Sequence, residues 1–132
     1  MLEEALYSYL SDILSVGTRI FPKRAPEGTV IPYVTYERVS AQRTYTHDPF
    51  PELPWVRVRV SFACVGQTAL ESISLGNEVV AALSSYSGDM DGVAIGKSDV
   101  VNETDLYDPQ SKLYRRVVDV LIDHEELEVT SS

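Results

Sequence analysis

The centre of the chain, from Trp55 to Tyr86, carries two hydrophobic patterns in succession. In its first half, apolar residues occupy every second position, which is typical of a strand with one buried face. In its second half, they recur every three or four positions, which is typical of a helix packed on a surface. We therefore predict a strand followed directly by a helix, with a core that includes Val58, Val60, Phe62, Ile73, Val80 and Leu83.

Local signals mark the ends of this predicted helix. Thr68 is followed by Glu71 three residues later, which is the capping-box spacing. In that motif each side chain accepts a hydrogen bond from the backbone of the other residue. Gly66 interrupts the strand just before this pair, and Gly88 follows the last apolar position of the helix. Because glycine readily adopts the left-handed conformation found after helices, we expect the helix to end near Gly88.

The N-terminal part predicts a second helix and an irregular connection. Apolar residues between Leu2 and Ser15 recur at helical spacing and would form one stripe on a helix. Glu3 and Glu4 lie in the first turn of this predicted helix, where negative charge is stabilising. Prolines between Pro22 and Pro32 predict a turn or an edge segment. At 132 residues the chain is expected to form one domain over 1–124, followed by a polar tail over 125–132.

Three further segments rich in β-forming residues predict the remaining strands, and the last of them directs Val118 and Val120 into the core. The order α-β-β-α-β-β predicts an α+β fold, with a mostly antiparallel four-stranded sheet and both helices on one face. Such a sheet has two open edges, and pairing with a neighbouring subunit is one way to cover them. The predicted strands span 33–40, 92–105 with a bulge at Gly96, and 112–124, with a turn over 106–111 between the last two.

The segment from Ala41 to Pro54 fits neither pattern. It contains three prolines, which are incompatible with a central strand, and loops of this length are commonly functional. We predict that it contacts a partner, because its large apolar residues have no core position. The outward positions of the next strand, which include two arginines, are expected to contact acidic residues of an adjacent subunit. The predicted interface comprises Tyr45, His47, Phe50, Leu53, Trp55, Arg57 and Arg59.

The net charge of −9 argues against nucleic-acid binding as the main activity, since such binding depends on cations that neutralise phosphate. An acidic surface repels DNA and suits a conduit better than a clamp. The N-terminus lacks the regions of a signal peptide, and no segment is long enough to span a bilayer. We therefore expect a protein that is made in a cytoplasm and does not enter a membrane.

Candidate catalytic residues are few. His47 and Asp48 could orient an imidazole for base catalysis, but no nucleophile motif accompanies them, and Asp48 before a proline also fits a turn. His124 is expected to be a solvated strand end, with a pH-sensitive interface residue as the alternative. Cys64 is the single cysteine, which excludes an intrachain disulfide, and its position predicts burial. We predict no catalytic, metal or cofactor site.

The aspartates of Asp89 to Gly92 resemble the start of a calcium loop. The position where a calcium loop places its glutamate is Val100 in this chain, so the match fails. A turn between the helix and the following strand accounts for these residues.

Three stretches together resemble one protein family in their order and spacing. They are RIFPKRAPEGTVIPYVTYERVS (19–40), the strand and helix of residues 55–86, and NETDLYDPQSKLYRRVVDVLIDH (102–124). In combination they resemble the tail-completion family of tailed bacteriophages and phage-like gene transfer particles. That family overlaps in fold with tail terminators and head–tail joining proteins, and the resemblance covers nearly the whole chain.

The resemblance implies a non-enzymatic virion protein that forms a homohexameric ring at the junction of tail and neck. The implied partners are other copies of the chain, the tail tube protein and a neck or head-completion (stopper) protein, and DNA passes through the ring without specific binding. Another neck or head–tail connector is an alternative. So is a monomeric adaptor that binds one partner with the 41–54 loop, or a small hydrolase that uses His47 and Asp48.

Overall fold

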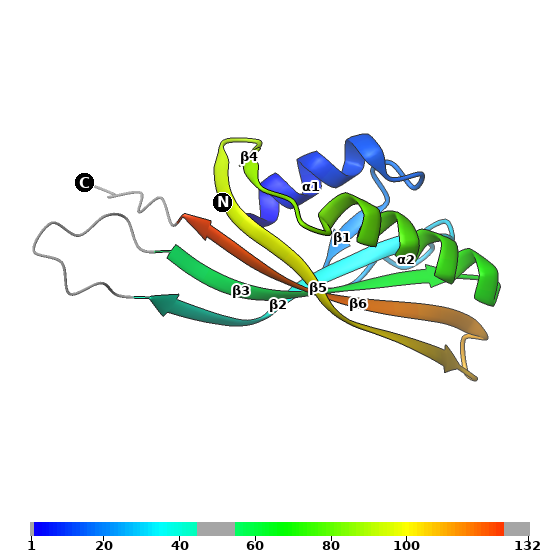
Figure 1. The fold of residues 1–132 in the computed structure, drawn as a ribbon. Coiled ribbons are helices and arrows are strands. Elements are labelled where there is room, and N and C mark those ends of the chain that lie inside the picture. Colours follow the sequence, from blue (N-terminus) through cyan, green and yellow to red (C-terminus); the bar gives the residue numbers. More distant parts are fainter. Residues whose placement is uncertain (1, 45–54, 126–132) are drawn as a thin grey trace, which may run out of the picture.

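The computed structural model describes residues 2–44 and 55–125 of the chain. Within these ranges two helices and six strands follow one another (Figure 1). The elements are α1 (Leu2–Ile13), β1 (Ile20–Pro22), β2 (Tyr33–Thr44), β3 (Trp55–Gly66), α2 (Ala69–Leu83), β4 (Gly88–Met90), β5 (Val93–Asp108) and β6 (Leu113–Glu125).

The six strands form one mixed sheet in the order β1-β2-β3-β6-β5-β4. β1 lies parallel to β2, and every other neighbouring pair is antiparallel. The α+β class was predicted correctly, but the prediction of a four-stranded sheet was wrong: the sheet has six strands, includes one parallel pair and is curled. β1 and β4 have three residues each, too few for a recognisable alternation, and the backbone of the neighbouring strand holds them in place.

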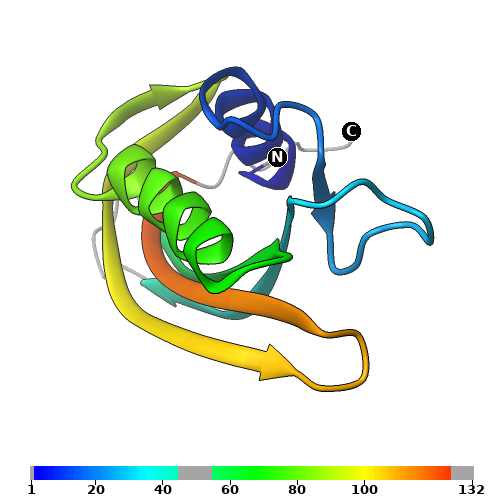
Figure 2. The same cartoon turned by 90° about the vertical axis from the view of Figure 1, so that its right-hand side faces the viewer.

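The sheet curls into a half-barrel with α2 on its concave side (Figure 2). α2 packs on β3, β6 and β5, whereas α1 contacts the two short edge strands β1 and β4 as well as α2. Polar contacts add to the buried apolar face of α1: the Tyr9 hydroxyl donates to the Ala82 carbonyl at 3.1 Å, the Tyr36 hydroxyl donates to the Glu3 carbonyl at 3.2 Å, and Arg38 pairs with Glu3 at 2.7 Å. α1 therefore closes the open side of the half-barrel instead of extending a flat helical layer.

The start of α2 follows the capping prediction with one change. The Thr68 hydroxyl accepts from the Glu71 N–H at 3.1 Å, as predicted. The Glu71 carboxylate, however, accepts from the N–H of Gln67 at 2.8 Å, one residue earlier than expected. The helix ends at Leu83 instead of near Gly88, because Ser85 adopts the left-handed conformation (φ 58°) and its N–H donates to the Ser98 carbonyl of β5.

The alternating residues of β3 lie where their pattern placed them. Val58, Val60 and Phe62 are buried, as are Val118 and Val120 of β6. On α2, Leu83 is buried, but Ile73 and Val80 are only half-buried. The other inward positions of the helix are Ser72, Leu75, Gly76 and Val79, so the buried stripe lies partly around the helix from the predicted one.

The connection between β2 and β3 is shorter than predicted. β2 continues to Thr44, and its residues from Ala41 onward pair with β3 up to Trp55. The prediction placed these residues in a loop, since local sequence shows no strand pattern there and only the partner strand supplies it. The bulge predicted at Gly96 is confirmed, because the register of β5 against β6 shifts between Ile95 and Lys97.

Replacing Phe62 with alanine tests this core. The side chain is 0% exposed, so Phe62→Ala should lower the free energy of unfolding by about 3–5 kcal/mol. Urea denaturation measures this value, and Val101→Ala at an exposed position provides the control, with an expected change within about 0.5 kcal/mol. A loss below about 1 kcal/mol for Phe62→Ala would contradict the packing described here.

Candidate assembly interface

Both sides of the sheet present open strand edges. β1 pairs with β2 only as far as Tyr36, where the Lys23 N–H donates to the Tyr36 carbonyl. The outer edge of β2 is therefore unpaired over 37–44 among the described residues. At the other side, β4 and the Ser85–Tyr86 backbone cover β5 only up to Ser98, which leaves 99–108 without a partner strand in the described parts of the chain. Unpaired edges are ready-made sites for pairing with another chain.

The second open edge belongs to an exposed hairpin, which we call the arm (residues 101–112). Every residue of the arm is exposed, including Leu106 and Tyr107, each at 50%. The sequence predicted a turn from 106 to 111, but β5 continues to Asp108, because the Tyr107 ring packs on the Tyr114 ring across the hairpin at 4.8 Å. The arm was missed as an interaction element, although the apolar pair Leu106–Tyr107 beside a turn was a usable signal.

The end of the arm carries an ionised carboxylate. Asp108 accepts from the Gln110 N–H and the Ser111 hydroxyl, both at 3.0 Å. These bonds, the Gln110 N–H first, hold the pKa of Asp108 below its usual range. Its side chain is therefore a fixed negative charge at the end of the hairpin.

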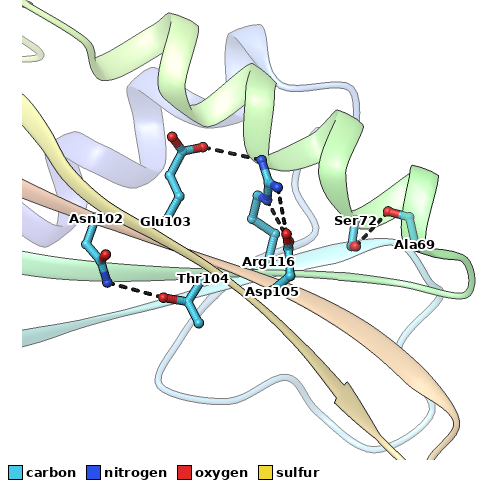
Figure 3. A network of polar contacts seen from close by, with 7 residues as sticks. All are labelled: Ala69, Ser72, Asn102, Glu103, Thr104, Asp105 and Arg116. Atoms are coloured by element: carbon cyan, nitrogen blue, oxygen red, sulfur yellow. Dashed lines mark hydrogen bonds and ion pairs between the residues drawn. The ribbon is translucent and has the colours of Figure 1, made fainter.

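One arginine of β6 attaches the arm to α2 (Figure 3). The Arg116 guanidinium makes two hydrogen bonds to Asp105, at 2.7 and 2.8 Å, and pairs with Glu103 at 3.3 Å. Hydrogen bonding by Arg116 lowers the pKa of Asp105. The stem of Arg116 crosses Gly76, where a Cβ would lie only 2.4 Å from the arginine Cδ. Gly76 therefore provides the space in which β6 and the helix meet.

A groove of about 270 Å³ lies between the arm and the first turns of α2. Its helix side is formed by Ala69, Ser72 and Ile73, and its other side includes Leu106 and Tyr107 of the arm and Tyr114 of β6. Leu70, in the same helical turn, is 79% exposed. Large exposed apolar side chains of two elements, α2 and β5, thus lie at this groove.

The face of the sheet away from α2 carries charged pairs between neighbouring strands. Arg57 pairs with Asp123 at 2.8 Å, and Arg59 pairs with Asp119 at 2.9 Å. Partial burial acts to raise the pKa of Asp119, but hydrogen bonds from Arg59, Ser61 and Asn102 outweigh it and lower that pKa. Carboxylates of the same chain thus already pair with both arginines that were expected to contact a neighbouring subunit.

The same face contains a basic hollow of about 330 Å³. The connection after β1 contributes Lys23 and Arg24, and β6 contributes Arg115. None of these three cations has an ion pair within the described parts of the chain. Glu37 also lines the hollow, so its described lining carries a net positive charge on a chain whose net charge is −9.

The remaining predicted interface residues fall mostly outside the described structure. Tyr45, His47, Phe50 and Leu53 lie outside it, as does the His47–Asp48 pair of the hydrolase hypothesis. Trp55 begins β3 opposite Glu125, the last described residue of the chain. Their role in an interface therefore stays a prediction.

Two candidate chemical groups are buried. His124 is 6% exposed, so its prediction as a solvated strand end was wrong; β3 and β5 flank it on both sides. Cys64 is buried as predicted, and burial raises the pKa of its thiol to about 12. A thiol with this pKa stays protonated at neutral pH and is a poor nucleophile.

The aspartates of residues 89–92 form the tight turn of the β4–β5 hairpin. Asp91 (φ 47°) and Gly92 (φ 90°) both have positive φ, as a two-residue type I′ turn requires. The Asp89 carboxylate accepts from the Gly92 N–H at 3.2 Å. Across residues 2–44 and 55–125 the structure groups no three potential metal ligands, and no helix there is long and apolar enough to cross a membrane.

Comparison with known proteins identifies one family. The model of the family described as tail completion protein gp17 matches residues 4–125. Among solved structures, a chain of "Virion of native gene transfer agent (GTA) particle" shares the fold, with a TM-score of 0.63 and 10% sequence identity over 95% of this chain and 92% of that chain. A search of curated proteins finds no match.

The contact between Gly76 and Arg116 predicts that the effect of Gly76→Ala on stability changes sign when Arg116 is removed. Gly76→Ala should destabilise the protein by about 1–3 kcal/mol, because the arginine stem is held by its bonds to Asp105 and must shift. With Arg116→Ala already present, Gly76→Ala should instead stabilise it by about 0.5–1 kcal/mol, since alanine is the better helix former. A double-mutant cycle by urea denaturation measures both values, and equal effects in the two backgrounds would contradict this contact.

Proposed function

Because this chain belongs to the family of tail completion protein gp17, we propose that six copies of it form a ring that caps the tail tube and joins it to the neck of a phage or phage-like particle. The protein is a structural component of the virion. The proposal adds three points to this family membership: the number of subunits, the tube and stopper proteins as partners, and the passage of DNA. The hexamer itself is inferred from the family resemblance.

The pair of open edges is the observation that supports a ring best. The edge of β2 (37–44) and the edge of β5 (99–108) lie at opposite sides of the same sheet. A contact between two different surfaces of identical subunits is heterologous, and such contacts generate closed rings when the rotation between subunits allows it. Pairing β2 of one copy with β5 of the next would continue the sheet around the ring and leave neither edge exposed.

The electrostatics suit a conduit for DNA. The net charge of −9 discourages tight binding of a polyanion along the ring. On the face of the sheet away from α2, Arg57 and Arg59 are already paired with Asp123 and Asp119. These arginines therefore offer DNA little attraction. Membership of a structural family likewise favours this role over the hydrolase alternative.

Lysine substitutions on the two edges test ring formation. Val39 and Val101 are exposed on the β2 and β5 edges, so Val39→Lys with Val101→Lys should prevent rings while leaving the melting temperature nearly unchanged. Native mass spectrometry, with and without purified tube protein, measures the subunit number. Ile13→Lys, at an exposed site on α1, is the matched control and should form rings. If the edge variant assembles like the wild type, edge pairing is wrong; if the wild type stays monomeric on the tube, the ring itself is wrong.

Removing the 45–54 segment tests its predicted role as a partner contact. Thr44 pairs with Trp55, so Asn-Gly in place of residues 45–54 would join β2 to β3 through a two-residue turn and keep the ladder intact. We expect unchanged stability by thermal denaturation and a loss of tail completion, scored by electron microscopy of particles. Normal tails with this variant would remove the segment from the interface.

A further inference from the structure

The two open edges differ in what lies at their ends. At the Glu37 end of the β2 edge, β1 stops and the chain turns away through Lys23 and Arg24 beside the basic hollow. At the Asp99 end of the β5 edge, the Ser85–Tyr86 backbone stops the edge, whereas the Asp108 end is free and carries the carboxylate of the arm. Among the described residues, each edge therefore has one end that a neighbouring segment obstructs and one end that none obstructs.

The direction of pairing decides which ends meet. In a parallel arrangement the two obstructed ends coincide, so that the Ser85–Tyr86 segment of one copy lies against the end of β1 of the next. In an antiparallel arrangement each obstructed end faces a free end. Antiparallel pairing is also the rule for every other neighbouring pair in this sheet except β1 with β2. Sterics therefore favour the antiparallel arrangement.

The lengths of the edges then place the end of the arm. The β2 edge spans 37–44 and the β5 edge spans 99–108, and each contains one register irregularity, at Val39 and Val101 respectively. With Asp99 near Thr44, the strands run together until β2 reaches Glu37. The last residues of β5 then extend past Glu37 to the point where Lys23 and Arg24 leave the edge.

Charge complementarity supports this placement. The end of the arm holds Asp105 and Asp108, both with lowered pKa values and therefore ionised at neutral pH. Asp105 is bonded to Arg116 of its own chain, but the side chain of Asp108 has hydrogen-bond partners only from its own turn among the described residues. The hollow offers Lys23 and Arg24 without ion pairs from the described chain, whereas the charge of Arg115 already contributes to lowering the pKa of Asp108 in its own chain.

We propose that β5 of one subunit pairs antiparallel with β2 of the next, and that Asp108 at the end of its arm enters the basic hollow of that neighbour beside Lys23 and Arg24. The inference rests on the proposed ring, for which it specifies the direction of strand pairing and the charged contact at its end. The occupant of the hollow is thus a second copy of this chain and not a nucleic acid.

Cysteine crosslinking between differently labelled copies tests the direction. Asp108→Cys protein is mixed with either Arg24→Cys or Thr44→Cys protein and oxidised in the presence of tube protein. The antiparallel arrangement predicts disulfide-linked dimers with Arg24→Cys only, whereas a parallel arrangement predicts them with Thr44→Cys only. Cys64 can remain, because it is fully buried and its thiol is protonated. Crosslinking of neither pair above the level seen in denaturant, while rings form, would overturn the proposal.

A charge exchange tests the contact itself. Asp108→Lys should reduce ring formation, measured as the hexamer fraction by native mass spectrometry, and Arg24→Asp in the same chain should restore it. Lys97→Asp, at an exposed position of β5 outside both the arm and the hollow, replaces Arg24→Asp as the control and should give no rescue. Equal rescue by both would mean that only net charge matters and would refute the specific contact. Failure of the wild type to form rings would instead refute the proposed function, so the two failures are distinguishable.

Discussion

The contact of Arg116 with Gly76 fixes how the helix sits in the curled sheet. The arginine stem fills the space of a missing side chain on α2, and its guanidinium is held by two bonds to Asp105. Because the stem needs this space, α2 must turn Gly76 toward β6, and Leu75 and Val79 then become the buried neighbours. The same residue connects the helix to the arm. The side chain of Arg116 thus links the packing of α2 to the exposed arm.

α1 imposes the second constraint, because it contacts both edge strands of the half-barrel. A curled sheet with two short edge strands would be free to open, and the bond of Tyr9 to Ala82 and the pairing of Glu3 with Arg38 oppose this. Within the described residues, a strand of only three residues covers each edge and the longer part stays open. The edges are therefore held at a fixed separation and angle, which is what a repeating contact between subunits requires.

Sequence patterns identified the parts of the fold whose cause is local. The alternation through Val58, Val60 and Phe62 reports a buried face directly, and the spacing of Thr68 and Glu71 reports a helix start. The patterns failed where the cause lies in a distant segment. No residue near Ile73 indicates that Arg116 decides which face of α2 is buried. The short strands β1 and β4 form because they pair with the longer strands β2 and β5.

The candidate interface was predictable only in part for the same reason. Arg57 and Arg59 were placed on the outer face by alternation, but their carboxylate partners come from β6, more than fifty residues away. The cations of the hollow come from the β1–β2 connection and from β6, and no local sequence pattern indicates that these two segments meet. The family resemblance indicated what the surface is for, while the structure indicates which edges and charges are available to it.

The energetics of an edge contact bear on when such a ring can form. The β2 edge offers residues 37–44, enough for about eight backbone hydrogen bonds, each with a net value of about 1 kcal/mol. Association of two free subunits costs about 4–15 kcal/mol in lost motional freedom, so edge pairing alone is close to balance. A finished tube that holds subunits side by side would remove much of that cost. In the proposed arrangement, rings would then close on completed tubes in preference to free solution, and the charged contact at the arm would select the correct direction of pairing.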